Sequence, residues 1–375
     1  FFRLMKYFIF IPHMNIGGVE RSFLTLSNQL LEKGNNVSII TLNQSKNLLN
    51  YDNKIEIISL KTSRSILSLF KLSKMLSEKK PDILISAQYY ANIIAVFSSI
   101  FSKHKVKVIL SERLHLSSTL KQYNFFKKVI LKLLIKFTYP NSDLIYGNSE
   151  SVCQDLRENY VNKSTKIIKI FNPSSLKNII KLSKEKVNDT WISKSATPII
   201  LYVGRLSLQK DIPTMLNTYK IITNEFDSKL LIVGDGPQRK LIEEFKLNNP
   251  KLEKQIKLIG YSENPYKFFK YSKVFMLTSL YEGLPNVLIE SQILTTPIVA
   301  TDCPGGTAEV LENGKSGLLA NIKDTKKLSE KTLSILKNEN VSNQLKKNMN
   351  LSIKRFDPSM VTEHLISEIK NTFNS

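Results

Sequence analysis

The sequence predicts an α/β protein of two domains, each a doubly wound parallel sheet. Three observations predict this class. Short apolar segments alternate with segments of helical period, the alternation stops near residue 172 and restarts at residue 198, and 375 residues with 42% hydrophobic composition can bury two cores. Such alternation is typical of a sheet covered by helices on both faces.

In the first half, seven apolar or β-branched segments are expected as strands. They are 7–11, 37–42, 55–58, 83–86, 106–110, 144–146 and 166–170. Helical patterns fall between several of them, at 20–32, 66–76, 91–101, 125–137 and 151–158. No segment reaches the ~20 apolar residues that a membrane-spanning helix needs. The apolar start lacks a small-residue cleavage site, so we expect a first strand there and no signal peptide.

The break in the pattern predicts the domain boundary. Residues 1–175 are expected as the N-terminal, acceptor-binding domain, the polar segment 176–196 as a linker and 197–356 as the C-terminal, donor-binding domain. Strands of the second domain are expected at 198–204, 229–233, 257–259, 274–277 and 297–300. The helical segment 357–375 is expected to pack back on the first domain. Ligands of such sheets bind at the carboxyl ends of strands, so we expect the site in a cleft between the domains.

The charge is large and uneven. The formal net charge is +22, with +15 in residues 1–180 and +7 in residues 181–375. Residues 61–136 alone hold 15 basic and 3 acidic residues. This balance favours a polyanionic partner such as nucleic acid, acidic lipid or a phosphorylated substrate, although a general lysine bias is the alternative. Two cysteines cannot build a disulfide scaffold, which favours a reducing compartment.

Glycine-rich and basic turns follow several expected strands. Gly17 and Gly18 precede a helix, whose N-terminus would favour an anion. Arg205 and Lys210 follow the first strand of the second domain, where both could reach a diphosphate. The Gly-x-Gly-Pro turn at 234–237 offers a further anion-friendly helix start. A tight turn or a solvated basic loop is the alternative at each place.

Two glutamates enclose the segment 282–290, Glu-Gly-Leu-Pro-Asn-Val-Leu-Ile-Glu. Pro285 is placed to open a helix, so Glu282 would precede it and Glu290 would lie inside it. Glu290 interrupts an apolar face, and its burial would need a partner. Carboxylates are natural acceptors for sugar hydroxyls, whereas one capping and one exposed glutamate is the alternative. Cys303 has no nearby histidine, so we interpret it as structural.

Taken together, these motifs resemble the family 4 retaining glycosyltransferases, which have the GT-B fold of two Rossmann-like domains facing across a cleft. The matching segments are Gly-Gly-x-Glu at 17–20, the Gly-Arg and Lys spacing at 204–210, Val-Gly-Asp-Gly-Pro at 233–237, the 282–290 segment and Gly-Lys-Ser-Gly-Leu-Leu at 314–319. The resemblance covers most of the chain and is densest from 199 to 320.

The activity that the resemblance implies is that of a hexosyltransferase. It would move a hexosyl or N-acetylhexosaminyl unit from a nucleotide-sugar, with a UDP-sugar as the expected donor. The acceptor would be lipid-linked or a glycan, in the synthesis of a bacterial surface polysaccharide such as O-antigen of lipopolysaccharide, capsule or exopolysaccharide.

The resemblance also implies roles for single residues. Arg205 and Lys210 would hold the donor diphosphate, and Glu282 would lie near the transferred sugar. Glu290 would bind the ribose hydroxyls. The other donor contacts would come from Gly17, Gly18, Gly234, Gly260, Tyr261, Gly283, Leu284, Pro285, Asn286, Val287 and Leu288. Sugar or acceptor contacts are expected among Glu112, Arg113, His115 and His13, and the choice among them stays open.

The implied chemistry requires no metal or cofactor. Breaking the sugar–phosphate bond develops negative charge on the diphosphate, which Arg205 and Lys210 would stabilise. The sequence has no His/Asp cluster with metal-ligand spacing. Retention in this family is thought to use front-face attack with the leaving phosphate as the base, so Glu282 is not expected to act as a nucleophile.

A basic amphipathic segment, residues 121–137, is the expected membrane contact. It has a large apolar fraction and five lysines, namely Lys121, Lys127, Lys128, Lys132 and Lys136. We expect it to lie on an anionic membrane, with the enzyme peripheral on the cytoplasmic face. A core-packed helix with a solvated lysine face is the alternative.

Two other functions are alternatives to glycosyl transfer. A nucleotide-sugar epimerase on the same fold would need no acceptor. A nucleic-acid-binding protein is supported by charge alone, and no nucleic-acid-binding module is recognisable, so no specific nucleic-acid partner is expected.

Overall fold

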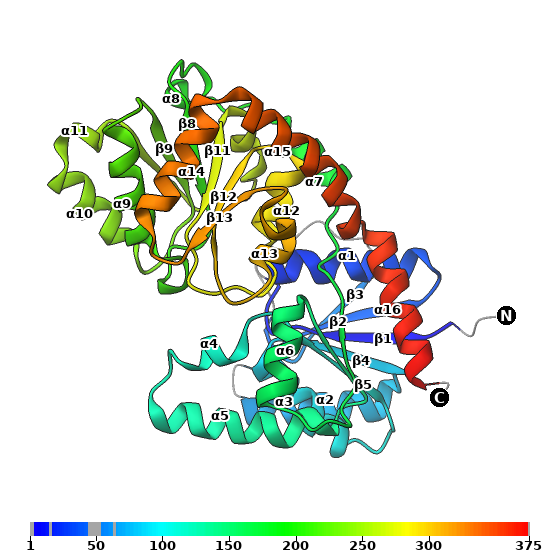
Figure 1. Cartoon of the computed structure of the whole chain (residues 1–375). Helices are drawn as coiled ribbons and strands as arrows, with labels where there is room; N and C mark the ends of the chain where they lie inside the picture. Colours follow the sequence, from blue (N-terminus) through cyan, green and yellow to red (C-terminus); the bar gives the residue numbers. More distant parts are fainter. Residues whose placement is uncertain (1–3, 15–16, 44–53, 63–64, 374–375) are drawn as a thin grey trace. The chain divides into compact units, whose positions relative to one another are not determined.

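The computed structural model describes residues 4–14, 17–43, 54–62 and 65–373. The chain forms two compact units. Unit 1 comprises Phe1–Ser174 and Phe356–Ser375, and unit 2 comprises Ser175–Arg355. Each unit contains a sheet of parallel strands with helices packed on it (Figure 1). The expected α/β class with two doubly wound domains is confirmed.

The sheet of unit 1 has the strand order β3-β2-β1-β4-β5-β6-β7. Its order reverses between β1 and β4, as in other doubly wound sheets. All seven strands expected from the sequence are present, with ends shifted by at most two residues. They are β1 (Lys6–Phe10), β2 (Asn36–Thr41), β3 (Glu56–Ser59), β4 (Ile83–Ala87), β5 (Lys107–Glu112), β6 (Leu144–Gly147) and β7 (Ile167–Lys169).

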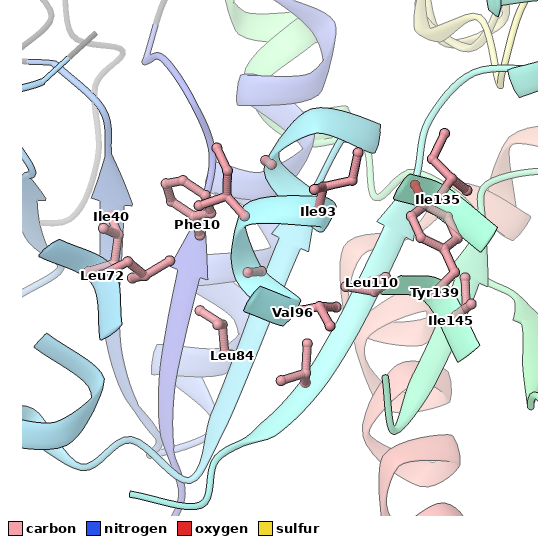
Figure 2. Packing of buried hydrophobic residues seen from close by; sticks show 14 of the residues in the cluster. Phe10, Ile40, Leu72, Leu84, Ile93, Val96, Leu110, Ile135, Tyr139 and Ile145 are labelled. Carbon is pink, nitrogen blue, oxygen red and sulfur yellow. The ribbon is translucent and has the colours of Figure 1, made fainter. Parts of the chain in front are cut away.

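Helices cover both faces of this sheet because alternate strand residues point into two apolar cores. Phe8 and Phe10 belong to one core, part of which Figure 2 shows. The helices on that side are α2 (Ser65–Lys79), α3 (Tyr89–Ile100), α4 (Leu116–Leu120), α5 (Phe125–Thr138) and α6 (Glu150–Asn159). Tyr7 and Ile9 belong to the other core. It is covered by α1 (Gly18–Glu32) and α16 (Pro358–Phe373).

The sheet of unit 2 has the order β10-β9-β8-β11-β12-β13 and reverses between β8 and β11. Its strands are β8 (Ile199–Val203), β9 (Lys229–Val233), β10 (Ile256–Gly260), β11 (Val274–Leu277), β12 (Ile298–Asp302) and β13 (Leu318–Asn321). Strand β13 was not expected from the sequence. This edge strand is only four residues long, and its apolar run of Leu318 to Ala320 is too short to be distinguished from a loop.

The helices of unit 2 fill the segments between these strands. On one face, α9 (Ile212–Thr223), α10 (Arg239–Asn248) and α14 (Thr325–Lys337) pack Met215, Ile242 and Leu333 into a common core. The remaining elements are α7 (Leu176–Ser183), α8 (Thr190–Ser193), α11 (Pro250–Glu253), α12 (Asn286–Ile293), α13 (Thr307–Val310), α15 (Glu339–Ser352) and the 3-10 turns η2 (Leu208–Lys210), η3 (Tyr266–Tyr271), η4 (Glu312–Gly314) and η5 (Ile353–Phe356).

Residues 176–196 were expected as a linker, but they form part of unit 2. Helix α7 buries Ile179 and packs against η3, and the Asp189 carboxylate pairs with the Lys257 ammonium. The Trp191 indole N–H donates to the Lys254 carbonyl. The polar composition of this segment hides two short helices, because each needs only one or two apolar anchors.

The C-terminal helix belongs to unit 1. Val361, Leu365 and Ile369 of α16 enter the core beneath α1, and Lys33 pairs with Glu363 at 2.7 Å. In the part of the chain that the structure describes, no helix is long and apolar enough to cross a membrane.

Candidate functional site

The polar residues of unit 2 gather where its strand order reverses. Strands β8 and β11 lie side by side, although β9 and β10 separate them along the chain. Their carboxyl ends lead to Lys210 and Glu282 respectively. Loops on the two sides of such a reversal diverge and leave room for a ligand.

Lys210 and Glu282 form a nearly buried ion pair. The Lys210 ammonium lies 2.6 Å from Glu282 Oε1, and the two side chains are only 14% and 7% exposed. The Ser279 hydroxyl also donates to Oε1 at 2.6 Å, and the Gln209 amide donates to Oε2 at 3.3 Å. Both carboxylate oxygens are therefore satisfied, as burial of a charged group requires.

The backbone around this pair is fixed by contacts between the two loops. The Thr278 hydroxyl donates to the Lys210 carbonyl at 2.9 Å, and the Leu280 N–H donates to the Gln209 carbonyl at 2.8 Å. Asp211, which ends η2, adopts a left-handed conformation with φ 47°. The pair is thus held in place before any ligand arrives, which is the arrangement that electrostatic catalysis uses.

Arg205 is placed differently from Lys210. Its side chain is exposed in the loop after β8, and it has no ion pair or side-chain hydrogen bond among the described residues. The sequence analysis expected both cations to reach one diphosphate. The structure ties Lys210 to a carboxylate and leaves the Arg205 guanidinium free to meet an anion.

A glycine turn supports the backbone of Glu282. Gly305 has φ +122°, and a Cβ atom there would lie 2.3 Å from the Glu282 carbonyl oxygen. The Glu282 N–H donates to the Pro304 carbonyl at 2.8 Å. The Gly-Gly turn after β12 therefore exists to let the Glu282 loop approach closely.

Gly234, directly after β9, plays a similar part. It has φ +145°, and a Cβ atom there would lie 1.9 Å from the Gly204 carbonyl oxygen. The Gly234 N–H donates to the Gly260 carbonyl at 2.7 Å. The loops that carry Arg205 and Tyr261 thus meet at Gly234, and Tyr261 itself is 57% exposed.

Glu290 lies inside α12, which begins after Pro285 as expected. Its side chain is buried, and the Tyr266 hydroxyl donates to Oε1 at 3.2 Å. The segment Gly283 to Leu288 forms the loop and first turn before it.

Cys303, nearby in sequence to Gly305, is buried, and burial raises the pKa of its thiol to about 12. A thiol that stays protonated is a poor nucleophile.

In unit 1, Glu112 is enclosed at the carboxyl end of β5. The Tyr139 hydroxyl donates to Oε2 at 2.6 Å, and the Arg113 N–H donates to Oε1 at 3.0 Å. Burial raises the pKa of Glu112 to about 7, although these hydrogen bonds oppose the shift. Glu112 is 1% exposed, so in this conformation it supports the β5 loop from within and does not meet solvent.

Arg113 is also buried, without a carboxylate partner within ion-pair distance among the described residues. Its guanidinium donates to the Ser22 hydroxyl at 2.7 Å and lies 4.8 Å from the Phe23 ring centre. Burial lowers the pKa of Arg113. The side chain therefore joins β5 to α1.

The two candidate histidines, His115 and His13, differ in their surroundings. The His115 Nδ1 accepts from the Ser118 N–H at 3.4 Å and so caps α4, and it lies 3.7 Å from the Asp155 carboxylate. His13 is exposed after β1. Gly17 caps α1 and Gly18 begins it; a Cβ atom at Gly17 would lie 2.3 Å from a Glu20 carboxylate oxygen. Their roles toward a ligand stay predictions.

Sequence reasoning missed Ser279 and Gln209, which hold the Glu282 carboxylate. A signal for both existed, since Gln209 directly precedes Lys210 and Ser279 lies three residues before Glu282 in a strand-end loop. Within the described residues, no group of three or more His, Cys, Asp or Glu side chains could hold a metal ion.

Comparison with known family models identifies the protein family of this chain. Residues 16–176 match the family model described as Glycosyltransferase Family 4, and residues 183–351 match the model for glycosyl transferases group 1. The chain belongs to the family 4, group 1 glycosyltransferases. As a glycosyltransferase, it carries the group 1 model on unit 2, where Lys210 and Glu282 lie.

Named relatives agree with this family. A Campylobacter jejuni protein named GalNAc-alpha-(1->4)-GalNAc-alpha-(1->3)-diNAcBac-PP-undecaprenol alpha-1,4-N-acetyl-D-galactosaminyltransferase is 29% identical over 98% of this chain and 100% of its own length. The capsular polysaccharide biosynthesis glycosyltransferase CapM of Staphylococcus aureus is 25% identical over 82% and 80%. An uncharacterized glycosyltransferase of Methanocaldococcus jannaschii is 29% identical, and the match spans 61% of its length. These relatives support a glycosyltransferase role in polysaccharide synthesis.

Solved structures share the fold. HepE of Anabaena in complex with UDP has a TM-score of 0.79 at 15% identity, covering 98% of this chain and 100% of that one. Sucrose-phosphate synthase of Thermosynechococcus elongatus has a TM-score of 0.83 at 18% identity, covering 99% of each chain. The glycosyltransferase thus has the two-domain GT-B fold.

Proposed function

We propose that this glycosyltransferase is a retaining enzyme that takes a hexosyl or N-acetylhexosaminyl unit from a UDP-sugar. The acceptor is lipid-linked, and the reaction takes place at the inner face of the cytoplasmic membrane during synthesis of a surface polysaccharide. The observation that carries the donor part is the Lys210–Glu282 pair at the strand reversal of unit 2, with the exposed Arg205 in the adjoining loop.

The two cations take the charge that the leaving diphosphate acquires. Lys210 donates one hydrogen bond to Glu282 and keeps further N–H donors for phosphate oxygens. Arg205 adds a planar fork that suits two phosphate oxygens. Because Lys210 and Arg205 can together carry this charge, we propose that the transfer needs no metal ion and proceeds in the presence of a metal chelator.

Glu282 orients Lys210 and lies near the sugar. Its oxygens already accept hydrogen bonds from Lys210, Ser279 and Gln209, which lowers its strength as a nucleophile. This arrangement supports front-face attack, in which the acceptor hydroxyl forms its bond on the side from which the diphosphate leaves and passes its proton to a leaving phosphate oxygen.

Recognition of the nucleoside is assigned to the neighbouring elements. Glu290 binds the ribose hydroxyls from α12, and Gly260 with Tyr261 borders the base. Two features support this assignment. The Glu290 carboxylate has a hydroxyl partner in Tyr266 that can yield to a sugar hydroxyl, and the Tyr261 ring is exposed at the end of β10.

The choice of donor and acceptor rests on what relatives are named for. The HepE structures are described as complexes with UDP and with UDP-glucose. The C. jejuni relative is named for an undecaprenol-linked acceptor. The HepE complexes support a UDP-sugar donor for this chain, and the name of the C. jejuni relative supports a lipid-linked acceptor.

A panel of nucleotide-sugars tests the proposal, with nucleotide release measured in the presence of membrane extract as acceptor source. Lys210→Ala should lower release by about 100-fold or more, the size expected when a group that stabilises the transition state is lost. Glu290→Ala removes the proposed ribose contact and should lower release by about 10-fold or more at low donor concentration. Lys240→Ala, in exposed α10, is the matched control and should equal the wild type. Nucleotide release equal to that of the wild type in all three variants would refute the site. Conversion of the donor without any acceptor would indicate an epimerase.

A further inference from the structure

Helix α5 exposes an unusual amount of apolar surface. Phe125 and Phe126 are 73% and 79% exposed, and Ile130, Leu133 and Phe137 are more than half exposed. Only Ile135 and Thr138 of this helix are buried. Figure 2 shows Ile135 beside Tyr139 in the core, which is how the helix is attached. A surface helix of a soluble domain normally turns polar residues outward.

The exposed residues form a stripe. Phe126, Ile130, Leu133 and Phe137 follow the spacing that places residues on one side of a helix. Lys128, Lys132 and Lys136 recur every four residues and are also exposed. The outward side of α5 is therefore an apolar stripe beside a basic stripe, and a core-packed helix with a solvated lysine face does not account for the exposed apolar stripe.

The apolar surface continues onto two neighbouring helices of unit 1. The Phe137 ring stacks on Phe97 of α3, with centres 5.9 Å apart. Phe101, one helical turn after Phe97, lies 6.2 Å from Phe70 of α2, and both rings are more than half exposed. A row of phenylalanines thus crosses α5, α3 and α2.

The charge around this surface is predominantly positive. Residues 61–136 hold 15 basic and 3 acidic residues, and no acidic residue occurs between Glu112 and Asp143. Lys103 and Lys105 are exposed beside the end of α3. Long lysine side chains beside apolar groups match a lipid surface, because the ammonium groups meet headgroup phosphates while the apolar groups enter the acyl boundary.

We propose that α5 is the membrane-docking element of unit 1 and lies in the plane of an anionic bilayer. Its phenylalanine stripe enters the acyl boundary, and Lys128, Lys132 and Lys136 contact the headgroups. The biological meaning of this contact rests on the proposed lipid-linked acceptor. The contact itself does not, since membrane binding is measured without any transfer of sugar.

Sedimentation with vesicles tests the two stripes separately. The whole protein should bind vesicles containing phosphatidylglycerol and bind phosphatidylcholine vesicles far more weakly. The charge variant K128Q/K132Q/K136Q should bind about fivefold more weakly per lysine, roughly 100-fold in total. The apolar variant F126S/I130S/L133S should lose a similar factor or more.

Matched changes in unit 2 provide the controls. K240Q/K251Q/K347Q removes the same charge from exposed positions, and Leu247→Ser and Leu351→Ser remove exposed leucines of 74% and 65% exposure. These variants should bind as the wild type does. Circular dichroism should be unchanged in all of them, because no buried side chain is altered.

Fluorescence shows whether the stripe enters the lipid. Trp191 is the sole tryptophan, so Trp191→Phe gives a dark background. In that background Phe126→Trp should shift to shorter wavelength on phosphatidylglycerol vesicles and be quenched by bromine-labelled acyl chains. Leu247→Trp, the matched position on α10, should show neither change.

Three results would overturn the proposal. The first is vesicle binding that both triple variants retain. The second is an unshifted tryptophan at position 126. The third is a wild-type protein that does not bind vesicles but self-associates, with the self-association lost in F126S/I130S/L133S. That result would make α5 an interface between copies of the chain. If the α5 variants lose vesicle binding but keep full donor-dependent nucleotide release, the result supports docking by α5. If the protein binds vesicles but releases no nucleotide from any donor, the result counts against the proposed function alone.

Discussion

Removing one charge of the Lys210–Glu282 pair should lower the free energy of unfolding of unit 2 by more than removing both charges does. The side chains are 14% and 7% exposed, so a charge left without its partner is poorly hydrated. Breaking a buried pair costs about 3–5 kcal/mol, whereas replacing both partners with neutral groups of similar shape is often close to neutral.

The surroundings of the pair set the expected size of each loss. Lys210→Met should lower the free energy of unfolding by about 2–3 kcal/mol, near the lower limit because Ser279 and Gln209 still donate to Glu282. Glu282→Gln should cost a similar amount, because it leaves the Lys210 ammonium unpaired. The double variant should lose no more than about 2 kcal/mol, which is at least about 2 kcal/mol less than the sum of the single losses.

Urea unfolding followed by Trp191 fluorescence measures this coupling. Trp191 lies in α8 of unit 2, so its emission reports on that unit. The exposed pair Lys240–Glu244 in α10, 83% and 49% exposed, is the matched control and should give a coupling near zero for K240M and E244Q. Strictly additive losses at Lys210 and Glu282 would refute the argument that the two groups depend on each other.

Three further predictions concern single residues. Gly305→Ala should cost about 2 kcal/mol or more in urea unfolding because its Cβ would meet the Glu282 carbonyl, whereas Gly314→Ala, where a Cβ atom meets nothing within 4 Å, should cost only about 1 kcal/mol; equal costs would contradict the close approach. Cys303 should resist a thiol reagent at neutral pH until the protein unfolds, and Cys303→Ser should keep activity; loss of activity in a stable variant would point to a chemical role. The pKa of Glu112, about 7, lies above its ordinary value of 4.5, so the folded state keeps a proton that the unfolded state releases. Stability should therefore fall by about 3 kcal/mol as pH rises from 4.5 through 7, and Glu112→Gln should flatten this slope in urea titrations followed by circular dichroism; an unchanged slope would contradict the assignment.

The sequence was sufficient to predict most strands and to place Arg205, Lys210 and Glu282 in loops at the carboxyl ends of strands. Buried parallel strands are short continuous apolar runs, which stand out between amphipathic helices, and the carboxyl ends of such strands share one edge. The edge strand β13 and helix α8 are four residues long and helix α7 is eight, so they are too short for the same reasoning to find them. Their place is set by contacts with distant segments.

The pairing of Lys210 with Glu282 could not be predicted, because 72 residues separate them and their contact depends on the order of β8 and β11. The outward side of α5 posed a similar problem. Its apolar residues occur on more than one side of the helix, and periodicity does not tell which side Ile135 anchors to the sheet.

The division of the chain has a consequence for how the protein is made. Unit 1 begins at the N-terminus but takes α16 from the far end, so the polypeptide passes between the units twice. During synthesis, unit 2 is complete on the ribosome before Val361, Leu365 and Ile369 emerge to close the core under α1. The first unit to start is therefore the last to finish. A fragment ending at residue 174 would carry an uncovered apolar face, and one proteolytic cut at the junction near residue 175 would leave the two units still covalently joined.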